Sequence, residues 1–196
     1  MKTYKPTTKS RRSMTGIDYP RLLSGHTPHK ALISGGQRAV GRNNYGRLTV
    51  RHKGGGVKRR FRAVDFRYDK LDIPARIATI EYDPNRSGFI GLAVYADGEK
   101  RYVLLPQGVK AGDSFVVSPK AELKAGNRLP LGRIPVDTPV YNVSLRPNGL
   151  ALLARSAGNA AKVKAQEAGY TFIELPSSEV RRVLSTAWAS IGAVSN

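Results

Sequence analysis

Short runs of alternating apolar and polar residues recur along the chain after residue 60, and this period of two predicts β-strands. Five runs come first, and Gly, Pro, Asn and Asp between them mark turns. They span residues 61–66, 75–82, 89–95, 100–105 and 113–117. The Asp97-Gly98 pair between two of these runs is typical of a tight hairpin. Five short strands with this spacing predict a small closed or half-closed barrel.

A second set of strand-like runs follows the glycine-containing segment 126–132. It comprises residues 140–145, 151–154, 162–167, 170–175 and 180–185. Ala168-Gly169 and Pro176-Ser177-Ser178 provide turns between the last three runs. No window longer than a few residues has a helical period, so the predicted fold class is all-β. Because each barrel would contain only about 60–70 residues, its own core is marginal, and we expect the two to pack on each other.

Residues 1–40 follow neither a period of two nor a period of 3.6. Pro6, Pro20 and Pro28 interrupt this part of the chain, and proline removes a backbone donor wherever it occurs. We therefore expect an extended segment with one short strand.

The charge is unevenly distributed and divides the chain. Of 196 residues, 33 are Lys or Arg and 14 are Asp or Glu, which gives a formal net charge of +19. Residues 1–62 hold 16 of these cations against one acid, whereas residues 63–196 hold 17 against 13. Self-repulsion on this scale opposes compaction, so the excess indicates a polyanionic partner, and nucleic acid fits best. The front of the chain is expected to be an extension that folds on that partner.

The stretch from Gly41 to Arg62 concentrates this charge. It contains eight Arg or Lys, two Asn, one His, five Gly and no acid. Glycines let backbone N–H groups approach an anion closely, and so many cations cannot be buried. The alternation of Arg47, Thr49 and Arg51 with apolar residues predicts a strand that carries cations on one face, about 6.6 Å apart. This pattern favours binding to a phosphate backbone over a solvated basic loop.

Several classes of enzyme are excluded by residues that the chain lacks. There is no cysteine, which excludes disulfides, zinc ribbons and thiol catalysis. The segment from Gly41 to Leu48 has the glycine spacing of a P-loop, but Arg and Leu replace the Lys and the Ser or Thr of that motif. Ser156 lacks the first glycine of a nucleophile elbow, and no histidine follows His52. Since no carboxylates converge either, we expect no enzyme activity, no metal site and no cofactor.

Membrane insertion, secretion and metal binding by histidine are not expected. No apolar run approaches the length of a membrane span, and the N-terminus lacks the apolar region of a signal peptide. Pro6 and Gly16 oppose the amphipathic helix of a mitochondrial presequence. His26 and His29 have no Cys or acid nearby to complete a ligand set, so we expect solvated loop histidines.

Most other aromatic and acidic residues are expected to be structural. Four aromatic residues are expected in barrel packing rather than in stacking on bases, namely Tyr82, Tyr95, Tyr102 and Trp188. Five acids lie at turns or strand ends, where we expect them to cap and to be solvated: Asp83, Asp97, Glu99, Asp113 and Glu122. The loop Arg155–Gly158 between two predicted strands is either an ordinary hairpin loop or a second phosphate contact, and the residues alone leave both open.

Motifs along nearly the whole chain resemble those of one known family. The first reads Gly41-Arg-Asn-Asn-x-Gly-Arg-x-Thr-x-Arg-His-x-Gly-Gly-Gly56 and continues to Lys58 and to Arg62-x-Val-Asp-Phe66. Further motifs follow in the same order: Glu81-Tyr-Asp-Pro-Asn-Arg86, Asp97-Gly98, Arg101-Tyr102, Gly112-Asp113 and Ala154-Arg-Ser-Ala-Gly158. The chain is similar to the universal family of ribosomal protein two of the large subunit, in its bacterial form.

This resemblance implies a basic extended segment at residues 1–59, an OB-fold barrel at 60–122 and an SH3-like barrel at 123–196. It implies a structural, non-enzymatic protein of the large ribosomal subunit in the cytoplasm, which supports assembly of the peptidyl-transferase region and subunit association. The implied partners are large-subunit rRNA and other large-subunit proteins. A role in subunit association would add contacts with the small subunit. Family members continue into a basic, glycine-rich tail, and this chain ends at Asn196, before that tail.

Carried over residue by residue, the resemblance places RNA contacts in the basic stretch and in the loop near residue 156. The predicted contacts are Arg42, Asn43, Asn44, Arg47, Arg51, His52, Lys53, Gly54, Gly55, Gly56, Lys58, Arg59, Arg60, Arg62, Arg155, Ser156 and Gly158. The residues themselves leave two alternatives, which are an independent OB-fold protein that binds single-stranded nucleic acid and an RNA-processing enzyme.

Overall fold

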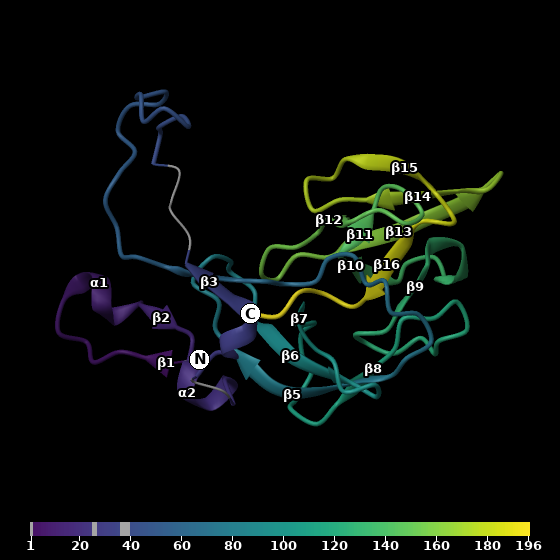
Figure 1. Cartoon of the computed structure of the whole chain (residues 1–196), viewed down its shortest axis with the longest axis horizontal. Helices are drawn as coiled ribbons and strands as arrows, with labels where there is room; N and C mark the ends of the chain where they lie inside the picture. Colours follow the sequence, from purple (N-terminus) through teal and green to yellow (C-terminus); the bar gives the residue numbers. More distant parts are fainter. Residues whose placement is uncertain (1, 25–26, 36–39) are drawn as a thin grey trace.

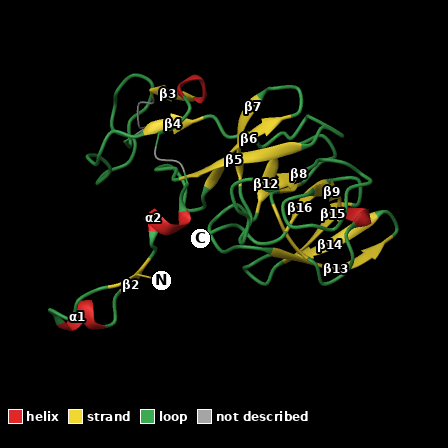
Figure 2. Ribbon diagram, turned by 90° about the horizontal axis from the view of Figure 1, so that it is seen from below, coloured by secondary structure: helices red, strands yellow, loops and turns green. Residues whose placement is uncertain are grey.

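The computed structural model of the chain describes residues 2–24, 27–35 and 40–196. The described chain is nearly all β, with an OB-fold barrel followed by an SH3-like barrel and a basic N-terminal segment (Figure 1; Figure 2). Among the described residues, no helix has the length and apolar character that crossing a membrane requires.

The first barrel is built on an antiparallel sheet with the strand order β7-β6-β5-β8. Its strands are β5 (Ala75–Glu81), β6 (Ile90–Tyr95), β7 (Lys100–Leu104) and β8 (Ser114–Phe115). These confirm four of the five predicted strands, although β8 is shorter than expected. The fifth, predicted at 61–66, is reduced to β4 (Arg60–Arg62), and Val64 then forms a parallel bridge to Tyr102 on β7.

The second barrel is a six-stranded antiparallel sheet with the order β15-β14-β13-β10-β16-β9, accompanied by the short pair β11-β12. The predicted runs correspond to β10 (Pro139–Tyr141), β11 (Val143–Ser144), β12 (Ala151–Leu153), β13 (Ala161–Glu167), β14 (Tyr170–Glu174) and β15 (Val180–Leu184). Both predicted hairpin turns are confirmed, because β13 pairs with β14 and β14 pairs with β15.

Two strands of the second barrel were not predicted, namely β9 (Arg128–Pro130) and β16 (Trp188–Ile191). They pair with each other, and Pro130 lies opposite Trp188. β9 begins with a charged residue and ends with a proline, so its three residues show no alternation of apolar and polar positions. Proline is nevertheless tolerated here because β9 is an edge strand of the sheet.

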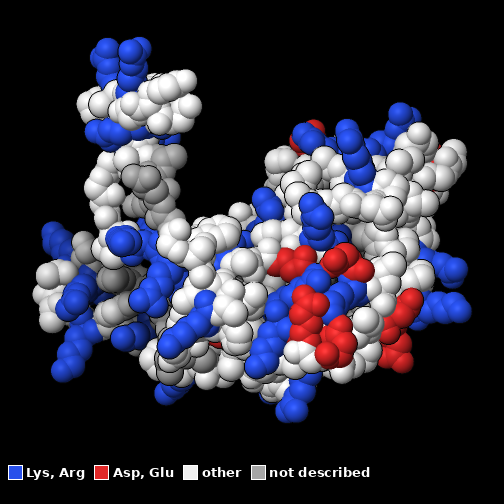
Figure 3. Space-filling view, viewed as in Figure 1, with Lys and Arg blue, Asp and Glu red and all other residues white. Residues whose placement is uncertain are grey.

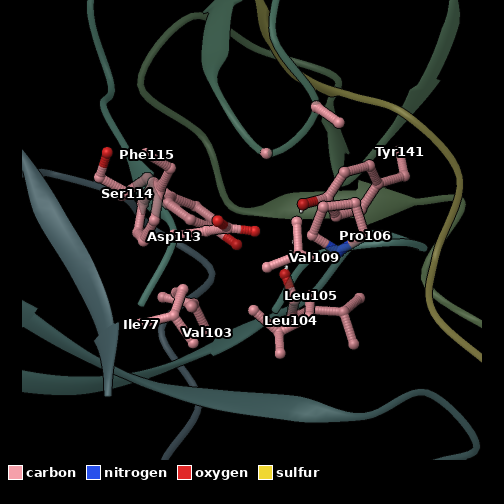
Figure 4. Close-up of a pocket in the computed structure, with 13 residues that line it drawn as sticks. Ile77, Val103, Leu104, Leu105, Pro106, Val109, Asp113, Ser114, Phe115 and Tyr141 are labelled. Carbon is pink, nitrogen blue, oxygen red and sulfur yellow. Dashed lines mark hydrogen bonds between the residues drawn. The ribbon is translucent and has the colours of Figure 1, made fainter. Parts of the chain in front are cut away.

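The two barrels are joined by shared packing. A small apolar cluster at the junction combines Leu104 of β7 with Tyr141 of β10 and with Val194. The Tyr141 hydroxyl donates to the Leu104 carbonyl over 3.4 Å, beside a void of about 20 Å³ that both barrels line (Figure 4). Val194 also bridges to Pro106. The expected contact between the barrels is therefore present, and the void has room for about one water molecule.

The N-terminal segment contains more regular structure than the sequence predicted. It forms β1 (Lys2–Thr3), α1 (Lys9–Arg12), β2 (Thr15–Gly16), α2 (Tyr19–Leu22), the 3₁₀ turn η1 (Lys30–Leu32) and β3 (Ile33–Gly35). The expectation of one short strand is wrong, because local caps close turns that periodicity does not reveal. The Thr8 hydroxyl accepts the Arg11 N–H over 3.3 Å at the start of α1.

Part of this segment packs on the first barrel. The Ser24 N–H donates to the Ile80 carbonyl over 3.1 Å, and the Ile80 N–H donates to the Ser24 hydroxyl over 2.7 Å. The ring of Tyr19 lies edge-on to Tyr82 at a centroid distance of 5.4 Å. β3 pairs with β4, so the chain just before the first barrel is held against the extension.

The aromatic expectations are confirmed for Tyr95 and Tyr102, which are buried in the first barrel. The expectation is wrong for Tyr82, which is 48% exposed at the end of β5 and contacts the extension instead. Trp188 is partly buried and packs against the core of the first barrel from the second. The two barrels therefore share aromatic packing that a strand-by-strand prediction cannot assign.

The histidine expectation is wrong for His29, while His26 lies outside the described residues. His29 is half-buried, and its backbone N–H donates to the Tyr102 hydroxyl over 2.8 Å. That hydroxyl in turn donates to the Glu81 carboxylate over 2.7 Å. His29 is therefore part of the attachment of the extension to the first barrel. In the described part of the chain, no group of three or more His, Cys, Asp or Glu could hold a metal ion.

Candidate nucleic-acid interface

A loop formed by residues 40–59, here called the projecting loop, stands away from both barrels (Figure 1). Its first half is closed by its own hydrogen bonds. The Asn43 side-chain oxygen accepts the N–H groups of Tyr45 (3.0 Å) and Arg47 (2.9 Å), and the Asn43 N–H donates to the Arg47 carbonyl (3.0 Å). These bonds fold the chain into a compact turn that needs no support from the barrels.

The strand predicted over Arg47, Thr49 and Arg51 does not form. Residues 47–51 follow a bent path that leads into a turn at Arg51, apart from one bridge between Arg42 and Leu48. The strand prediction is wrong because side-chain and carbonyl acceptors nearby take the backbone N–H groups that a β-ladder would use. The cations are therefore presented around a turn instead of along one strand face.

Gly41 is a position in this turn where both the backbone conformation and the surroundings require glycine. Its φ is +68°, and its carbonyl accepts the N–H groups of Thr49 (2.7 Å) and Val50 (3.2 Å). A Cβ at Gly41 would lie 2.4 Å from the Val50 carbonyl oxygen, which no real Cβ tolerates. Gly54 differs, because a Cβ there would meet nothing within 4 Å. A side chain is therefore excluded at Gly41 by both conformation and space, whereas Gly54 has room for one.

The cations of the projecting loop are exposed, and at its tip they are visible as a blue group above the body (Figure 3). Within the described ranges, no Lys or Arg from 40 to 62 forms an ion pair with a carboxylate. Arg62 is the exception to full exposure, since its Nε is buried without a described hydrogen-bond partner and its Nη1 donates to the Arg60 carbonyl over 2.9 Å. The charge of the loop is therefore available to an external anion.

The cations of the barrels are arranged differently, because several are paired with acids. Arg101 contacts Asp65 at 2.9 Å and also pairs with Asp69 and Glu99, while Lys70 pairs with Asp97 and Glu99. The hydrogen bond from Arg101 lowers the pKa of Asp69 below its ordinary value. Acidic side chains in Figure 3 gather on the barrels, away from the projecting loop. The body thus neutralises much of its own charge.

The second predicted contact, the loop from Arg155 to Gly158, is exposed and fixed to both barrels. The Ala157 N–H donates to the Ser87 hydroxyl of the first barrel over 3.1 Å, and the Gly158 N–H donates to the Val194 carbonyl over 3.1 Å. Gly158 has a φ of +70°. The loop therefore ties the two barrels together and leaves the Arg155 and Ser156 side chains exposed.

Arg155 and Ser156 line a cleft of about 600 Å³, here called the inter-barrel cleft, together with the first barrel and the end of the extension. Its other walls are Phe61, Val64, Phe66, Asn85, Arg86 and Ser87. The cleft brings part of the predicted basic stretch beside the predicted second contact. The distal residues of the projecting loop, including Arg47 and Arg51, do not line it.

Asn85, Arg86 and Ser87 are candidate contacts that the sequence reasoning missed. Arg86 donates from Nε to the Asp83 carboxylate, and Asp83 is buried, so the expectation that Asp83 is solvated is wrong. The Asn85 side-chain amide donates to the Arg60 carbonyl over 2.9 Å and joins this turn to β4. An arginine inside a predicted turn was the available signal, because the Asp-Pro-Asn-Arg turn presents a cation at a fixed position.

Comparison with known families decides what this chain is. The model described as Ribosomal Proteins L2, RNA binding N-terminal domain, matches residues 29–118. The model described as Ribosomal Proteins L2, C-terminal domain, matches residues 124–196. The chain belongs to the ribosomal protein L2 family.

As an L2 family member, the chain is a ribosomal protein of the large subunit that binds RNA and acts in translation. The L2 family is structural, and its RNA-binding N-terminal model covers the Gly41–Arg62 stretch and Arg86. The C-terminal L2 model covers Arg155–Gly158. Both surfaces described above therefore lie within the matched parts of the chain.

Proposed function

We propose that the chain holds folded large-subunit rRNA at two surfaces, supporting assembly of the peptidyl-transferase region and association of the subunits. The first surface is the projecting loop with β4, and the second is the loop at residues 155–158. The proposed contacts are the cations, the two asparagines, His52 and glycines 54–56 of the first surface, together with Arg155, Ser156 and Gly158. Large-subunit proteins are further partners, and contact with the small subunit is part of the proposal.

The observation that carries the proposal is the contrast in charge pairing. Loop cations such as Arg47 and Arg51 are exposed and have no carboxylate partner in the described residues, whereas Arg101 and Lys70 on the body are paired. Concentrated unpaired charge raises the free energy of the isolated fold and is relieved by an anion. RNA phosphates supply that anion, and the counterions they release drive binding.

A salt titration tests this proposal. Binding of the full chain to deproteinised large-subunit rRNA is measured between 50 and 200 mM salt. If 6–10 phosphates are contacted, affinity falls by about 10³-fold or more over this range, by the rule for duplex DNA. Weak binding with little salt dependence would contradict the proposal.

The same titration separates the alternatives. A short unstructured oligonucleotide is used as competitor, because an independent OB-fold protein for single strands would bind it as tightly as rRNA. We expect folded rRNA to be preferred. Adding magnesium and examining the RNA for cleavage or modification tests the enzyme alternative, for which we expect intact RNA.

We also propose the division into an extension (1–59), an OB-fold barrel (60–122) and an SH3-like barrel (123–196). The separate apolar cores of the two barrels support this division, one built around Ile77 and the other around Val163. Limited proteolysis of the free chain is expected to cut first within residues 40–59, where no apolar core holds the backbone. First cuts inside β5 or β13 would contradict this division.

A further inference from the structure

Four leucine side chains that belong to neither proposed RNA surface remain exposed to solvent. They are Leu71 of the first barrel and Leu145, Leu150 and Leu152 of the β11–β12 hairpin, and each is between 36% and 50% exposed. A single exposed leucine is common, whereas a group of them on one surface indicates an interaction site. Their placement therefore decides whether they form such a site, here called the leucine patch.

The register of the hairpin places its three leucines on one face. Ser144 lies opposite Ala151, and both side chains are fully buried. Leu150 and Leu152 flank Ala151, and Leu145 follows Ser144. Because neighbouring residues of an extended chain point to opposite sides, these three leucines point away from the core.

Leu71 joins the hairpin leucines across a groove. Leu71 and Leu150 line this groove, which has a volume of about 560 Å³, and the partly buried Trp188 lines it with them. The groove lies between the barrels, since Leu71 belongs to the first and Leu150 to the second. Its size and apolar walls suit a side chain of a bound partner.

The hairpin that carries the leucines is held in place from both sides. The Ser144 hydroxyl accepts the Trp188 N–H over 2.8 Å and donates to the Trp188 carbonyl over 3.0 Å. The Ala151 N–H donates to the Phe66 carbonyl of the first barrel over 2.8 Å. A partner therefore meets a preformed surface and does not have to order it, which reduces the entropic cost of binding.

Acidic side chains border the groove on the side of the first barrel. Asp69 lines the groove, and it shares Arg101 with Glu99, while Glu99 and Asp97 also pair with Lys70. The three acidic side chains are 42–60% exposed, whereas those of Arg101 and Lys70 are 22% and 13% exposed. The carboxylates are thus the outer groups of this cluster, and a partner approaching it meets negative charge.

We propose that the leucine patch is the docking site for a segment of another large-subunit protein, one that carries an apolar side chain beside Lys or Arg. The apolar side chain enters the groove between Leu71 and Leu150, and the cation contacts Asp69 and its acidic neighbours. This inference rests on the proposed function and deepens it, because it gives a protein partner of this chain both a surface and a chemistry.

The surface suits a protein segment better than RNA or a second copy of the chain. Leucine offers no hydrogen bond to a nucleotide, and phosphates would be repelled by the exposed carboxylates. Arg67 in the groove wall and Arg146 beside Leu145 are exposed cations, but the leucines and Asp69 separate them from any continuous basic stripe. A second copy would also carry a net charge of +19, and this like charge opposes association.

Photocrosslinking within the assembled subunit tests the proposal. Tagged full-length chain, in which the photoreactive residue benzoylphenylalanine replaces Leu152, is expressed in cells, and large subunits are isolated on a gradient and irradiated. Leu152 belongs to the patch but does not line the groove, so the groove stays intact. Mass spectrometry is expected to identify one crosslinked protein segment with an apolar residue beside Lys or Arg. The matched control carries the crosslinker at Leu184 of β15, which is also exposed, and should not reach that segment.

Two variants in the crosslinking background make the result specific to the groove and its charge. Leu71→Asp removes an apolar wall, so the crosslink yield should fall about tenfold, as for a residue central to an interface, whereas Leu71→Met should retain it. Asp69→Asn should reduce the yield about threefold, because an ion pair near the surface contributes little. Neither variant should change affinity for rRNA, since neither residue belongs to the proposed RNA surfaces.

Failure of this inference is distinguishable from failure of the proposed function. A crosslink only to rRNA, only to a second copy of the chain or to nothing would overturn the inference, while sedimentation with the large subunit would still support the proposed function. A crosslinked segment without Lys or Arg, or a crosslink that survives Leu71→Asp, would also overturn it. If the tagged chain does not sediment with the large subunit, both proposals fail. Thermal melting of each variant verifies that the fold is retained.

Discussion

In the projecting loop, arginine and lysine side chains extend into solvent, whereas at the junction between the barrels one arginine is enclosed by protein. Arg128 of β9 is 1% exposed. Its guanidinium donates to the Asn142 carbonyl over 2.6 Å and reaches the Ser190 hydroxyl and the Trp188 carbonyl at 3.4 Å. It also lies 4.6 Å from the ring centroid of Tyr68 in the first barrel.

Arg128 and the arginines of the projecting loop differ in the source of the polar groups that surround the guanidinium. Arg128 has no carboxylate within ion-pair distance among the described residues, and burial lowers its pKa to about 10. It stays charged at neutral pH because carbonyl, hydroxyl and aromatic groups of both barrels replace water. The loop arginines have no such surroundings. The same residue type therefore serves the fold in one region and an external partner in the other.

Neutralising charge in the projecting loop should give the largest effect. The triple variant Arg47→Gln, Arg51→Gln and Lys53→Gln removes three exposed cations, so affinity for rRNA falls about 10²- to 10³-fold at 0.1 M salt and the slope drops by about two to three. The melting temperature does not fall, since these side chains stabilise no core and their charges repel one another. Filter binding and thermal melting measure the two quantities.

The matched control removes equal charge from the body. This triple variant replaces three exposed lysines with glutamine, at Lys110, Lys120 and Lys124. None of the three lysines belongs to either proposed surface. We expect a loss of affinity below about threefold, because distant charges are screened at this ionic strength. Equal losses in both triple variants would remove the distinction between the loop and the body.

Truncating the enclosed arginine should produce the opposite pattern. Arg128→Ala leaves the Asn142 and Trp188 carbonyls without their donor and opens a cavity, so the free energy of unfolding falls by about 3 kcal/mol. Folded protein should still show the wild-type salt slope for RNA. Urea unfolding and filter binding measure the two effects, and a reduced slope with normal stability would reverse the roles given to the two regions.

Alkaline pH should destabilise the first barrel through Tyr102. Burial raises the pKa of Tyr102 to about 12 from its ordinary value near 10. The folded state therefore holds this proton more tightly, and the stability that it contributes is complete below pH 10 and is lost as the pH rises through 12. The loss in the free energy of unfolding is at most about 3 kcal/mol, because the two pKa units each correspond to about 1.4 kcal/mol.

Tyr102→Phe provides the control for this effect. The variant loses the hydrogen bonds to Glu81 and His29, so it is less stable at neutral pH, but its stability should decline less steeply between pH 10 and 12. Urea unfolding at each pH measures the free energy of unfolding. An unchanged alkaline decline in the variant would assign the titration to another tyrosine.

The smallest expected effect distinguishes two glycines of the same loop. Gly41→Ala cannot keep its turn, because φ is +68° and the new Cβ would collide with the Val50 carbonyl, so rRNA affinity should fall about tenfold through lost preorganisation. Global stability should stay within about 0.5 kcal/mol of wild type, as for a site outside any core. Gly54→Ala, where a Cβ meets nothing, should bind nearly as wild type.

The strands were predictable wherever one face is buried and the other is solvated. β5 shows this alternation in Ala75, Arg76 and Ile77, and DG and AG turns marked the hairpins. β9 was missed because it consists of an arginine, a leucine and a proline, and β16 was missed because it is mostly buried on both faces and shows no alternation. The strand over Arg47–Arg51 was wrong because Asn43 and the Gly41 carbonyl captured the backbone donors locally.

The sequence predicted which types of residue form the candidate site, but it did not predict how those residues are arranged in space. Charge density and glycine content pointed to the basic stretch, and the resemblance pointed to Arg155 and Ser156. Neither indicated that Arg86 and Arg155 share the ring of Phe66, since these residues are far apart in the sequence. Arg128 is a second example, because an arginine in the sequence suggests an exposed cation, whereas this side chain is buried.

The sequence by itself determined the all-β class, the positive front of the chain and the family, since periodicity, charge and ordered motifs are local properties of the chain. The tertiary structure alone decided which arginines are enclosed and which are presented, and which distant segments form the cleft between the barrels. The physical reason is that burial and hydrogen-bond partners depend on neighbours brought together by folding, and a cation's role follows from those neighbours.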